Sequence, residues 1–464
     1  MPTIESDSQA PPPVADDAAA RALSDAIDRV DVEAIQEAVD RLPAEDRPRI
    51  LDQLGKERLD RLVTCIEPGD AAHLLETLPD AAIAATLERI DPGAAAQLLE
   101  RLPSAERADL VQELSEDQAE SVLDALPEAI ANEARALSGY DPETAGGLLV
   151  TEVLSYADDR SVGDVVEDMR ANAERYRAYD VQYAFVTDAA GRLRGVLRLR
   201  DLLLAPWSRR IAEIMIPDPI RVSVDETLDD LESLFDDHGF FGVPAVDTDD
   251  RLVGVVQRSR VEEALAERSE SDYRKSQGII GGEELRSMPT LLRARRRFAW
   301  LSINIVLNSF AAAVIALNEA TLEAVIALAV FMPIISDMSG CSGNQAVAVS
   351  MRELTLGLIK PRDALRVWRK ELSVGVINGL GLGLLLMIGG SIYAGNIWFG
   401  AVVGSALTLN TLIALSVGGL VPILLKAIKK DPALASGPIL TTVTDMCGFL
   451  LVLTLASLMM DKLL

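Results

Sequence analysis

Apolar residues recur every 12 positions through the first quarter of the chain. The recurring positions are Val30, Leu42, Leu54, Ile66, Leu78, Ile90, Leu102, Leu114 and Leu126, and several are followed by a breaker (Pro43, Gly55, Pro68, Pro79, Pro92, Pro103 and Pro127). Because proline ends one helix and fits the first turn of the next, each unit is predicted to be one short helix and a turn. Stacked units of this kind form an α-solenoid, which we assign to residues 21–138.

A strand-turn-strand pattern then occurs twice. Residues 181–200 show it first, and residues 240–257 repeat it at an offset of 59. Identical residues occupy the corresponding positions, which are Asp188, Arg192, Leu193, Gly195 and Val196 in the first copy and Asp247, Arg251, Leu252, Gly254 and Val255 in the second. An amphipathic helix precedes each copy, at 162–177 and at 228–237. We predict two related α/β domains, residues 139–206 and 207–265.

The remainder of the chain is dominated by long apolar segments. A membrane-spanning helix needs about 20 apolar residues. The segments are 298–318, 324–351 (interrupted by Asp337), 372–425 (long enough for two helices, with a break at 393–396) and 432–460 (with Asp445). The pattern predicts five transmembrane helices within residues 293–464.

The basic residues orient these five helices, because Lys and Arg concentrate in cytoplasmic loops. Four arginines at 293–297 precede the first segment, and the basic loops 352–370 and 426–430 fall on the same side. We therefore predict cytoplasmic N-terminal domains, a C-terminus outside and a location in the cell (plasma or inner) membrane. Residues 1–20 lack the basic and apolar parts of a secretory signal, and their Pro-rich, acidic composition predicts a disordered tail.

Charge separates the two halves of the chain. The whole chain carries −27; from Ser287 onward there are 9 acidic and 14 basic residues, which leaves 62 acidic and 30 basic residues, or −32, in residues 1–286. This acidic surface excludes nucleic acid as a partner, since nucleic-acid binding needs a basic surface. Two histidines and three scattered cysteines exclude a His-rich zinc site and a disulfide framework. No enzyme motif of the nucleotide-loop, HExxH or G-x-S-x-G type is present, so we predict that the protein is not an enzyme.

Two carboxylates fall inside the apolar segments, where ionisable groups are costly and usually functional. Asp445 follows Thr441 by one helical turn, and Asp337 precedes Asn344 by two. Carboxylate, hydroxyl and amide oxygens are hard ligands that suit Mg²⁺ or Ca²⁺, and Mg²⁺ could pass largely hydrated. We name Asp445, Thr441, Asn344 and Asp337 as candidate metal residues. The alternative for either carboxylate is a hydrogen bond between helices. Gly and Pro near Asp337 predict an interrupted helix that lines a polar cavity.

The order of these parts resembles the MgtE-type magnesium channel/transporter family from about residue 25 to the C-terminus. The stretches that carry the resemblance are YDPETAGGLL (140–149), RRRFAWL (295–301), the GxxGNQ core (340–345) and DPALASGPILTTVTD (431–445). The α/β pair itself resembles a pair of CBS domains. The fold class is then a multidomain membrane protein with an all-α solenoid, an α/β CBS pair and a five-span helical domain.

The resemblance implies a homodimer in membrane lipid that mediates Mg²⁺ uptake. Asp445, Thr441 and Asn344 match pore positions of the family, residues 266–292 match its connecting (plug) helix, and cytosolic Mg²⁺ would bridge the cytosolic parts and close the pore. The chain differs from the family at Cys341 and Gly437 in the pore and at Gly239, Arg260 and Arg268 among the sensor positions; Glu263 and Asp272 remain as sensor candidates. CBS pairs often bind ATP or related nucleotides, with Asp201 as the candidate for the ribose. The alternative function is transport of another divalent ion (Co²⁺, Mn²⁺) or a gradient-coupled mechanism.

Overall fold

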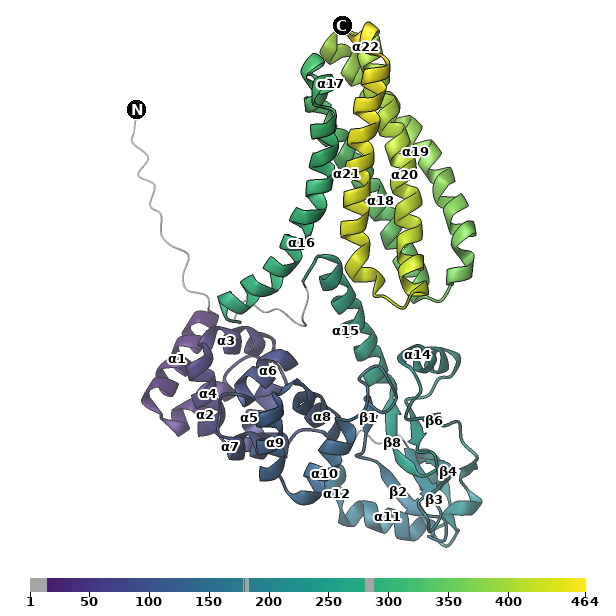
Figure 1. Ribbon diagram of the computed structural model, residues 1–464. Helices are drawn as coiled ribbons and strands as arrows, with labels where there is room; N and C mark the ends of the chain where they lie inside the picture. The colour runs from purple at the N-terminus through teal and green to yellow at the C-terminus, as the bar shows by residue number, and fades with distance from the viewer. Residues whose placement is uncertain (1–14, 178, 180–182, 280–287) are drawn as a thin grey trace, which may run out of the picture. The chain divides into compact units, whose positions relative to one another are not determined.

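The structure is a computed structural model, which describes residues 15–177, 179, 183–279 and 288–464 (Figure 1). The chain divides into two compact units, Met1–Glu267 and Arg268–Leu464, and each is described by itself. The first contains short helices and two sheets, and the second contains long helices.

The first unit begins with ten short α-helices. They are α1 (Ala15–Arg29), α2 (Val32–Asp40), α3 (Arg47–Leu54, after the 3₁₀ turn η1, Ala44–Asp46), α4 (Lys56–Cys65), α5 (Pro68–Leu75), α6 (Asp80–Leu87), α7 (Pro92–Leu99), α8 (Ser104–Glu113), α9 (Glu116–Ala125) and α10 (Glu128–Leu137). From α4 to α10 each helix begins 12 residues after the previous one. The repeat in the sequence therefore marks the period of the helices, as predicted.

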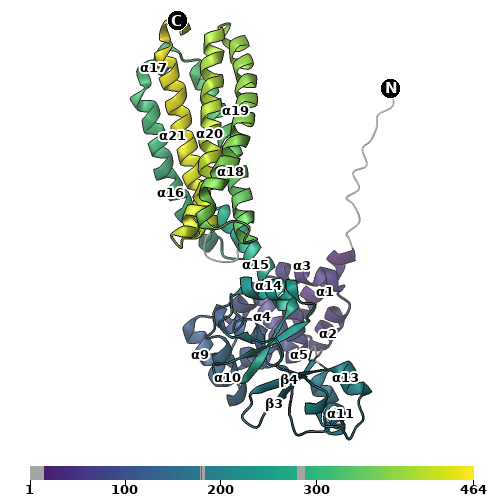
Figure 2. The same cartoon turned by 90° about the vertical axis from the view of Figure 1, so that its right-hand side faces the viewer.

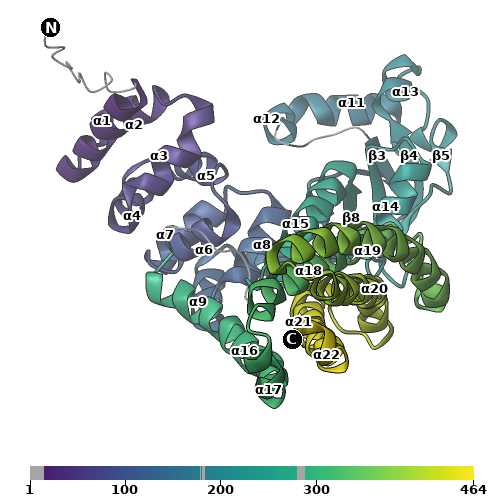
Figure 3. The same ribbon diagram turned by 90° about the horizontal axis from the view of Figure 1, so that it is seen from above.

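The repeated apolar residues supply the core of this helical domain. Eight of the nine are buried, from Leu42 to Leu126, whereas Val30 lies exposed in the turn after α1. From α4 to α10, each helix packs against the helix two places further along the chain, α5 against α7 and α6 against α8, for example. Figure 3 shows the helices following one another in a row. Alternate helices thus bury one another's apolar faces.

The α/β part of the first unit contains two four-stranded sheets. One has the order β2 (Leu154–Ala157), β3 (Tyr183–Thr187), β4 (Leu193–Arg198), β5 (Ile216–Pro217), and the other has β1 (Leu149–Val150), β8 (Leu252–Gln257), β7 (Gly242–Val246), β6 (Val222–Ser223). The hairpins β3–β4 and β7–β8 differ by an offset of 59 residues at every end, as the sequence predicts. Both carry a register shift before the last residue of their first strand.

Each sheet also takes a strand from the other half of the pair. β1 lies in the first half of the pair but pairs with β8 of the second half. β5 lies in the second half but pairs with β4 of the first half. The remaining elements are α11 (Val162–Ala171), α12 (Ala173–Tyr176), α13 (Leu199–Leu204), η2 (Ile211–Glu213), α14 (Leu228–Asp237) and α15 (Arg258–Ser276). The pair is therefore interlocked across the division that the sequence suggests at 206 and 207.

The second unit is a bundle of long helices. They are α16 (Thr290–Leu317), α18 (Leu328–Thr355), α19 (Ala364–Ala394), α20 (Ile397–Ala427) and α21 (Pro432–Leu458), with the short α17 (Glu319–Ala324), η3 (Pro361–Asp363) and α22 (Met460–Leu463). In Figure 2, as in Figure 1, α19, α20 and α21 run side by side. In the described part of the chain, four helices are long and apolar enough to cross a membrane: 290–317, 361–394, 397–427 and 437–458. The fifth predicted span, α18, has 28 residues but is more polar.

Glycines set the distance between α19 and α20. A Cβ atom at Gly383 would lie 2.0 Å from Thr408 Oγ1, and one at Gly379 would lie 3.0 Å from the carbonyl oxygen of Thr408. The predicted break between these helices is a turn in which Gly395 has φ +62° and Asn396 accepts a hydrogen bond from the backbone N–H of Trp398 at 2.8 Å. The glycine spacing therefore serves helix packing.

Three expectations about local structure were wrong. Residues 15–20 belong to α1 rather than to a tail, since their alanines favour a helix; residues 1–14 lie outside the described residues. The connecting helix begins at Arg258, not at 266, because β8 leads directly into α15. α15 ends at Ser276, before Gly278 with φ +77°, and 290–292 form the first turn of α16. The predicted helical residues 280–287 lie outside the described residues.

Candidate ion pathway

The main candidate site lies where α18 packs against α21. Asp445 of α21 is half-buried and accepts a hydrogen bond on Oδ1 from the hydroxyl of Ser336, which belongs to α18. A hydroxyl that donates to a carboxylate stabilises its charged form and fixes its direction. The structure therefore gives this carboxylate, the strongest candidate from the sequence, a defined orientation within the bundle.

A polar stripe on α18 continues this site. Asp337, Cys341 and Asn344 follow one another at intervals of four and three residues, so they share one face of the helix, and all three are exposed in this single chain. On α21, Thr441 is also exposed and lies one turn before Asp445. Asp337 directly follows Ser336, whose hydroxyl donates to Asp445. The two candidate carboxylates therefore belong to the same pair of packed helices, α18 and α21.

The helix that carries this stripe is continuous, so the predicted interruption was wrong. α18 runs unbroken past Pro333, Gly340 and Gly343. Pro333 lies inside the helix, where it removes one backbone hydrogen bond without ending α18. At Gly343 a Cβ atom would lie 2.7 Å from Leu440 and 3.1 Å from the carbonyl oxygen of Ala414, so this glycine lets α18 approach both α20 and α21.

These side chains do not make a closed metal cage in one chain. Among the described residues, no group of three or more His, Cys, Asp or Glu side chains could hold a metal ion. Mg²⁺ dehydrates reluctantly and usually keeps several waters, with one or two carboxylates as protein ligands. The arrangement therefore suits an ion that keeps much of its water or that is shared between copies of the chain.

A second set of charged residues joins the helical domain to the α/β pair within the first unit. Arg260 of α15 lies 2.6 Å from the carboxylate of Asp109 on α8 and 3.0 Å from that of Glu263 on its own helix. Its side chain is 20% exposed and that of Asp109 is 27% exposed, so the pair is largely shielded from water. The family resemblance implied a sensor position at Arg260, which stays a prediction; here its guanidinium is a cation between two carboxylates.

Glu106 lies on the same helix as Asp109 and faces the same cluster. Burial raises the pKa of Glu106 to about 7, and the nearby carboxylate of Glu76 adds to the increase, whereas Arg260 opposes it. Burial also raises the pKa of Asp109, although Arg260 again lowers it. The junction thus carries one carboxyl group, that of Glu106, whose protonation changes near neutral pH.

Hydrogen bonds to two further carboxylates, Glu152 and Glu133, hold another part of this junction. Glu152, just after β1, accepts hydrogen bonds from the backbone N–H (2.9 Å) and hydroxyl (2.6 Å) of Ser104 at the start of α8. Glu133 of α10 accepts from the Thr151 hydroxyl at 2.6 Å and from Arg107 at 3.0 Å. The helical domain is therefore attached to the α/β pair through several independent contacts.

The other sensor candidates are placed separately. Gly239 follows α14 in the α/β pair. A Cβ atom added at this position would meet no atom within 4 Å. Asp272 of α15 lies 3.9 Å from Lys275, whose Nζ also lies 3.1 Å from the carboxylate of Asp431 at the start of α21. Burial raises the pKa of Asp272.

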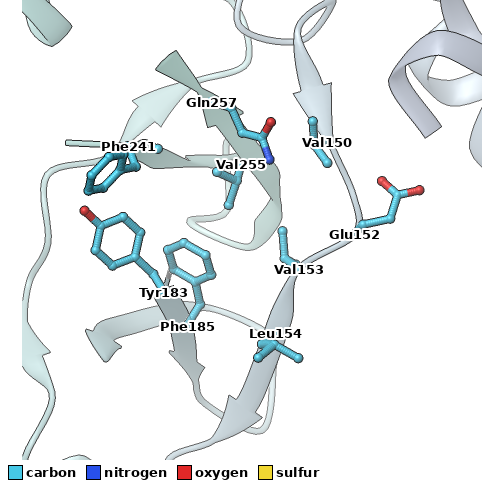
Figure 4. A pocket seen from close by; sticks show the side chains of 10 residues that line it. Val150, Glu152, Val153, Leu154, Tyr183, Phe185, Phe241, Val255 and Gln257 are labelled. Atoms are coloured by element: carbon cyan, nitrogen blue, oxygen red, sulfur yellow. The ribbon is translucent and has the colours of Figure 1, made fainter. Parts of the chain in front are cut away.

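A cavity of about 40 Å³ lies between the two sheets of the α/β pair (Figure 4). The rings of Tyr183, Phe185 and Phe241 lie close together on one side of it, and Glu152 lies on the other. Asp201, the candidate for a nucleotide ribose, does not line this cavity; it lies in the first turn of α13, 3.5 Å from Arg200.

Comparison with known families matches three parts of the chain. The family described as "Divalent cation transporter" matches residues 332–455, "MgtE intracellular N domain" matches 84–143, and "CBS domain" matches 145–208 and 211–267. The "Magnesium transporter MgtE" of Thermus thermophilus is 34% identical over 337 residues, which are 71% of this chain and 73% of that protein. The chain belongs to the MgtE family.

Other similar proteins carry the same name. The "Magnesium transporter MgtE" of Enterococcus faecalis is 31% identical over 330 residues, which are 71% of this chain and 72% of that protein. A crystal structure of the cytosolic domain of the Mg²⁺ channel MgtE in complex with ATP is 31% identical, with a TM-score of 0.48 over 53% of this chain and 100% of that one.

The matched region of the MgtE transporter model contains all four candidate residues. Asp337, Asn344, Thr441 and Asp445 fall within 332–455, and so does Ser336. Ser336 was missed by the sequence reasoning, because a serine in an apolar helix carries no sign of which helix it will face. Only the packing of α18 against α21 identifies it.

Proposed function

We propose that this MgtE-family chain is a Mg²⁺ channel or transporter that mediates Mg²⁺ uptake. The observation that carries the proposal is the carboxylate of Asp445, which lies in the middle of an apolar helix and is held by Ser336 of the neighbouring helix. A charge at this depth is costly and is usually kept where an ion passes. Mg²⁺ as the ion is supported by the hard-oxygen ligands and by the names of the relatives.

The proposal includes a homodimer with its ion pathway between the two copies. Asp337 and Asn344 are exposed on α18 in a single chain. Such polar groups are unfavourable against lipid and are better placed in a water-filled path. A second copy would cover this face and supply a second Asp445, so that two carboxylates could act on one hydrated ion.

We extend the proposal to five spans, with the C-terminus outside. α18 has 28 residues and would measure about 42 Å, enough to cross a hydrocarbon core of about 30 Å. Its polarity is explained if it lines the pathway. The basic residues 293–297, 352–370 and 426–430 then all lie in the cytoplasm, with the intracellular N domain. We also propose that α4 to α10 form a solenoid, which their alternate packing supports.

Gating by cytosolic Mg²⁺ is the regulatory part of the proposal. Residues 1–286 carry −32, so bound divalent cations would reduce the repulsion between the cytosolic parts. Glu263 and Asp272 on α15 are the candidate ligands for such ions, which would compete there with Arg260 and Lys275. The alternative is transport of another ion (Co²⁺ or Mn²⁺) or coupling to an ion gradient.

Nucleotide binding at the CBS pair is a separate proposal. The rings of Tyr183, Phe185 and Phe241 offer faces on which a base could stack, provided that the cavity of about 40 Å³ widens on binding. Calorimetric titration of the full-length protein with ATP tests it. Loss of binding in Phe241→Ala with binding kept in Asp201→Ala would place the nucleotide in the cavity, and the reverse result would place it beside α13.

The function itself is tested by Mg²⁺ influx into proteoliposomes. We expect Asp445→Asn to abolish influx or reduce it at least about 100-fold, because the neutral amide no longer attracts the cation. Asp461→Asn in the exposed α22 is the matched control and should conduct like the wild type. Wild-type influx in Asp445→Asn would refute the assigned pathway. Co²⁺ and Mn²⁺ competition, and influx with and without a proton or Na⁺ gradient, decide between the proposal and its alternative.

A further inference from the structure

A buried amide of α20 contacts both helices of the candidate pathway. Asn410 is 0% exposed. Its Nδ2 group donates to the carbonyl oxygen of Thr444 on α21 at 3.0 Å and to that of Ile335 on α18 at 3.5 Å. One side chain of a third helix therefore bridges the two helices that carry Ser336 and Asp445.

The two contacted carbonyls stand next to the pathway residues in sequence. Thr444 directly precedes Asp445, and Ile335 directly precedes Ser336, which donates to Asp445. A change in the relative height or rotation of α18 and α21 would lengthen one of the two bonds from Asn410. The Asn410 amide thus fixes the position of α18 relative to α21. The same relative position brings the Ser336 hydroxyl to the Asp445 carboxylate.

The packing around Asn410 leaves room for this amide. A Cβ atom at Gly448 of α21 would lie 2.7 Å from Nδ2 of Asn410, so any larger residue there would displace it. Within the described residues, Oδ1 of Asn410 has no hydrogen-bond partner. A buried unpaired acceptor costs about 1–3 kcal/mol, which an apolar residue of similar size would avoid. Ordinary packing does not explain this amide.

We propose that Asn410 is a positioning residue for ion passage, which holds α18 and α21 in the register that orients Asp445. The proposal rests on the proposed function only in taking Asp445 as the group that meets the ion. Its neighbour Thr411 provides a matched contrast: it is equally buried in α20, but among the described residues its hydroxyl donates only to the carbonyl oxygen of Leu407 of its own helix, at 2.8 Å.

The test is Mg²⁺ influx of the full-length protein in proteoliposomes, measured as the Mg²⁺ concentration for half-maximal influx. For Asn410→Leu, we expect this concentration to increase about tenfold, which is the effect of losing one hydrogen bond to a polar partner. Thr411→Val should stay within about twofold. An unchanged half-maximal concentration in correctly folded Asn410→Leu would overturn the proposal, and so would an equal effect in Thr411→Val.

A second pair of variants keeps the proposal testable if Asn410→Leu does not fold. Gly448→Ala should increase the Mg²⁺ concentration for half-maximal influx as Asn410→Leu does, because the new methyl group displaces Nδ2 of Asn410. In the double variant Asn410→Ala, Gly448→Ala, the added methyl should have no further effect beyond that of Asn410→Ala. Gly389→Ala, where a Cβ would meet no atom within 4 Å, is the control. Additive effects in the double variant would overturn the proposal.

These results are separable from a failure of the proposed function. If Asp445→Asn conducts normally, the pathway assignment fails whatever Asn410 does. If Asp445→Asn is inactive while Asn410→Leu and Gly448→Ala keep the wild-type half-maximal concentration, the pathway stands and only the positioning role is lost.

Discussion

The Ser336 hydroxyl is the single polar group that orients the Asp445 carboxylate in the described part of the chain. We expect Ser336→Ala to lower Mg²⁺ influx about tenfold, less than Asp445→Asn, because the charge remains but loses one charge-assisted hydrogen bond of about 1.5–3 kcal/mol. Ser339→Ala is the matched control: Ser339 lies on the same helix, is 0% exposed and, within the part of the chain that the structure describes, donates only to the carbonyl oxygen of Ile335. Influx into proteoliposomes measures both. Equal loss in the two variants would mean that α18 tolerates no change and that Ser336 has no specific role.

At the same scale, Glu106 gives the junction of the first unit a pH dependence. Its pKa in the folded chain is about 7, above the ordinary value of 4.5, because burial and the charge of Glu76 disfavour the ionised form. The folded state therefore binds the proton more tightly than the unfolded state. The stabilising effect is fully present below about pH 4.5 and is lost as the pH rises through about 7.

We therefore expect the first unit to lose about 1 kcal/mol of stability between pH 6 and pH 8 through this group. The charged groups that face Glu106 are Glu76, Asp80, Glu263 and Arg260. Thermal unfolding of the full-length protein in detergent measures the change, and Glu106→Gln, which cannot titrate, should remove this part of it. The same pH dependence in Glu106→Gln would assign it to the other carboxylates, Asp109 included.

At the scale of elements, helix packing in the second unit depends on glycines at defined contacts. A Cβ at Gly383 would lie 2.0 Å from Thr408 Oγ1 and 2.7 Å from the carbonyl oxygen of Gly404, whereas a Cβ at Gly381 would meet no atom within 4 Å. We expect Gly383→Ala to destabilise the α19–α20 pair by roughly 2 kcal/mol through overpacking. Gly381→Ala should be neutral or slightly stabilising, since alanine favours a helix. Thermal unfolding in detergent compares them, and equal midpoints would contradict the close approach.

The elements also show what the sequence could predict. A breaker at fixed spacing determines where a helix starts, so the 12-residue period of α4 to α10 was readable from one chain. The hairpins repeat at an offset of 59 because a local turn, with Asp188 or Asp247 accepting backbone hydrogen bonds, sets each register. The exchange of β1 and β5 between sheets was not predicted, because short edge strands are fixed by partners far away in the chain.

The candidate pathway divides in the same way. Asp445 and Asp337 were predictable, since a carboxylate in an apolar segment is visible without any structure. Ser336 and Asn410 were not, because serine and asparagine are common in membrane helices and only the contacts of α18, α20 and α21 single them out. Asp201 was named from the resemblance to CBS pairs; it does not line the aromatic cavity, and its role stays a prediction. Prediction fails here wherever the role of a residue depends on a different helix.

At the scale of the whole molecule, the separation between an acidic and an apolar part of the chain supports the proposed gating by Mg²⁺. Residues 1–286 carry −32 and the remainder carries +5. Closure that brings acidic domains together needs counter-ions, and the tethered guanidinium of Arg260 supplies only one of them, at Asp109 and Glu263. Divalent cations from the cytoplasm can supply the rest, so the transported ion would favour the closed state as it accumulates.

We therefore expect Mg²⁺ influx to fall as internal Mg²⁺ rises, by about tenfold between nominally zero and 10 mM, which corresponds to a coupling free energy within the usual 1–3 kcal/mol. Proteoliposomes loaded with graded Mg²⁺ measure this, with internal K⁺ at equal ionic strength as the control for screening. In Glu263→Gln the internal Mg²⁺ needed for closure should increase, because one candidate ligand is lost; Glu262→Gln, its exposed neighbour on α15, is the matched control. Influx that does not change with internal Mg²⁺ would contradict gating by cytosolic Mg²⁺. It would leave the proposed pathway through Asp445 intact. Arg260 would then be the counter-ion that holds this junction together without any divalent cation.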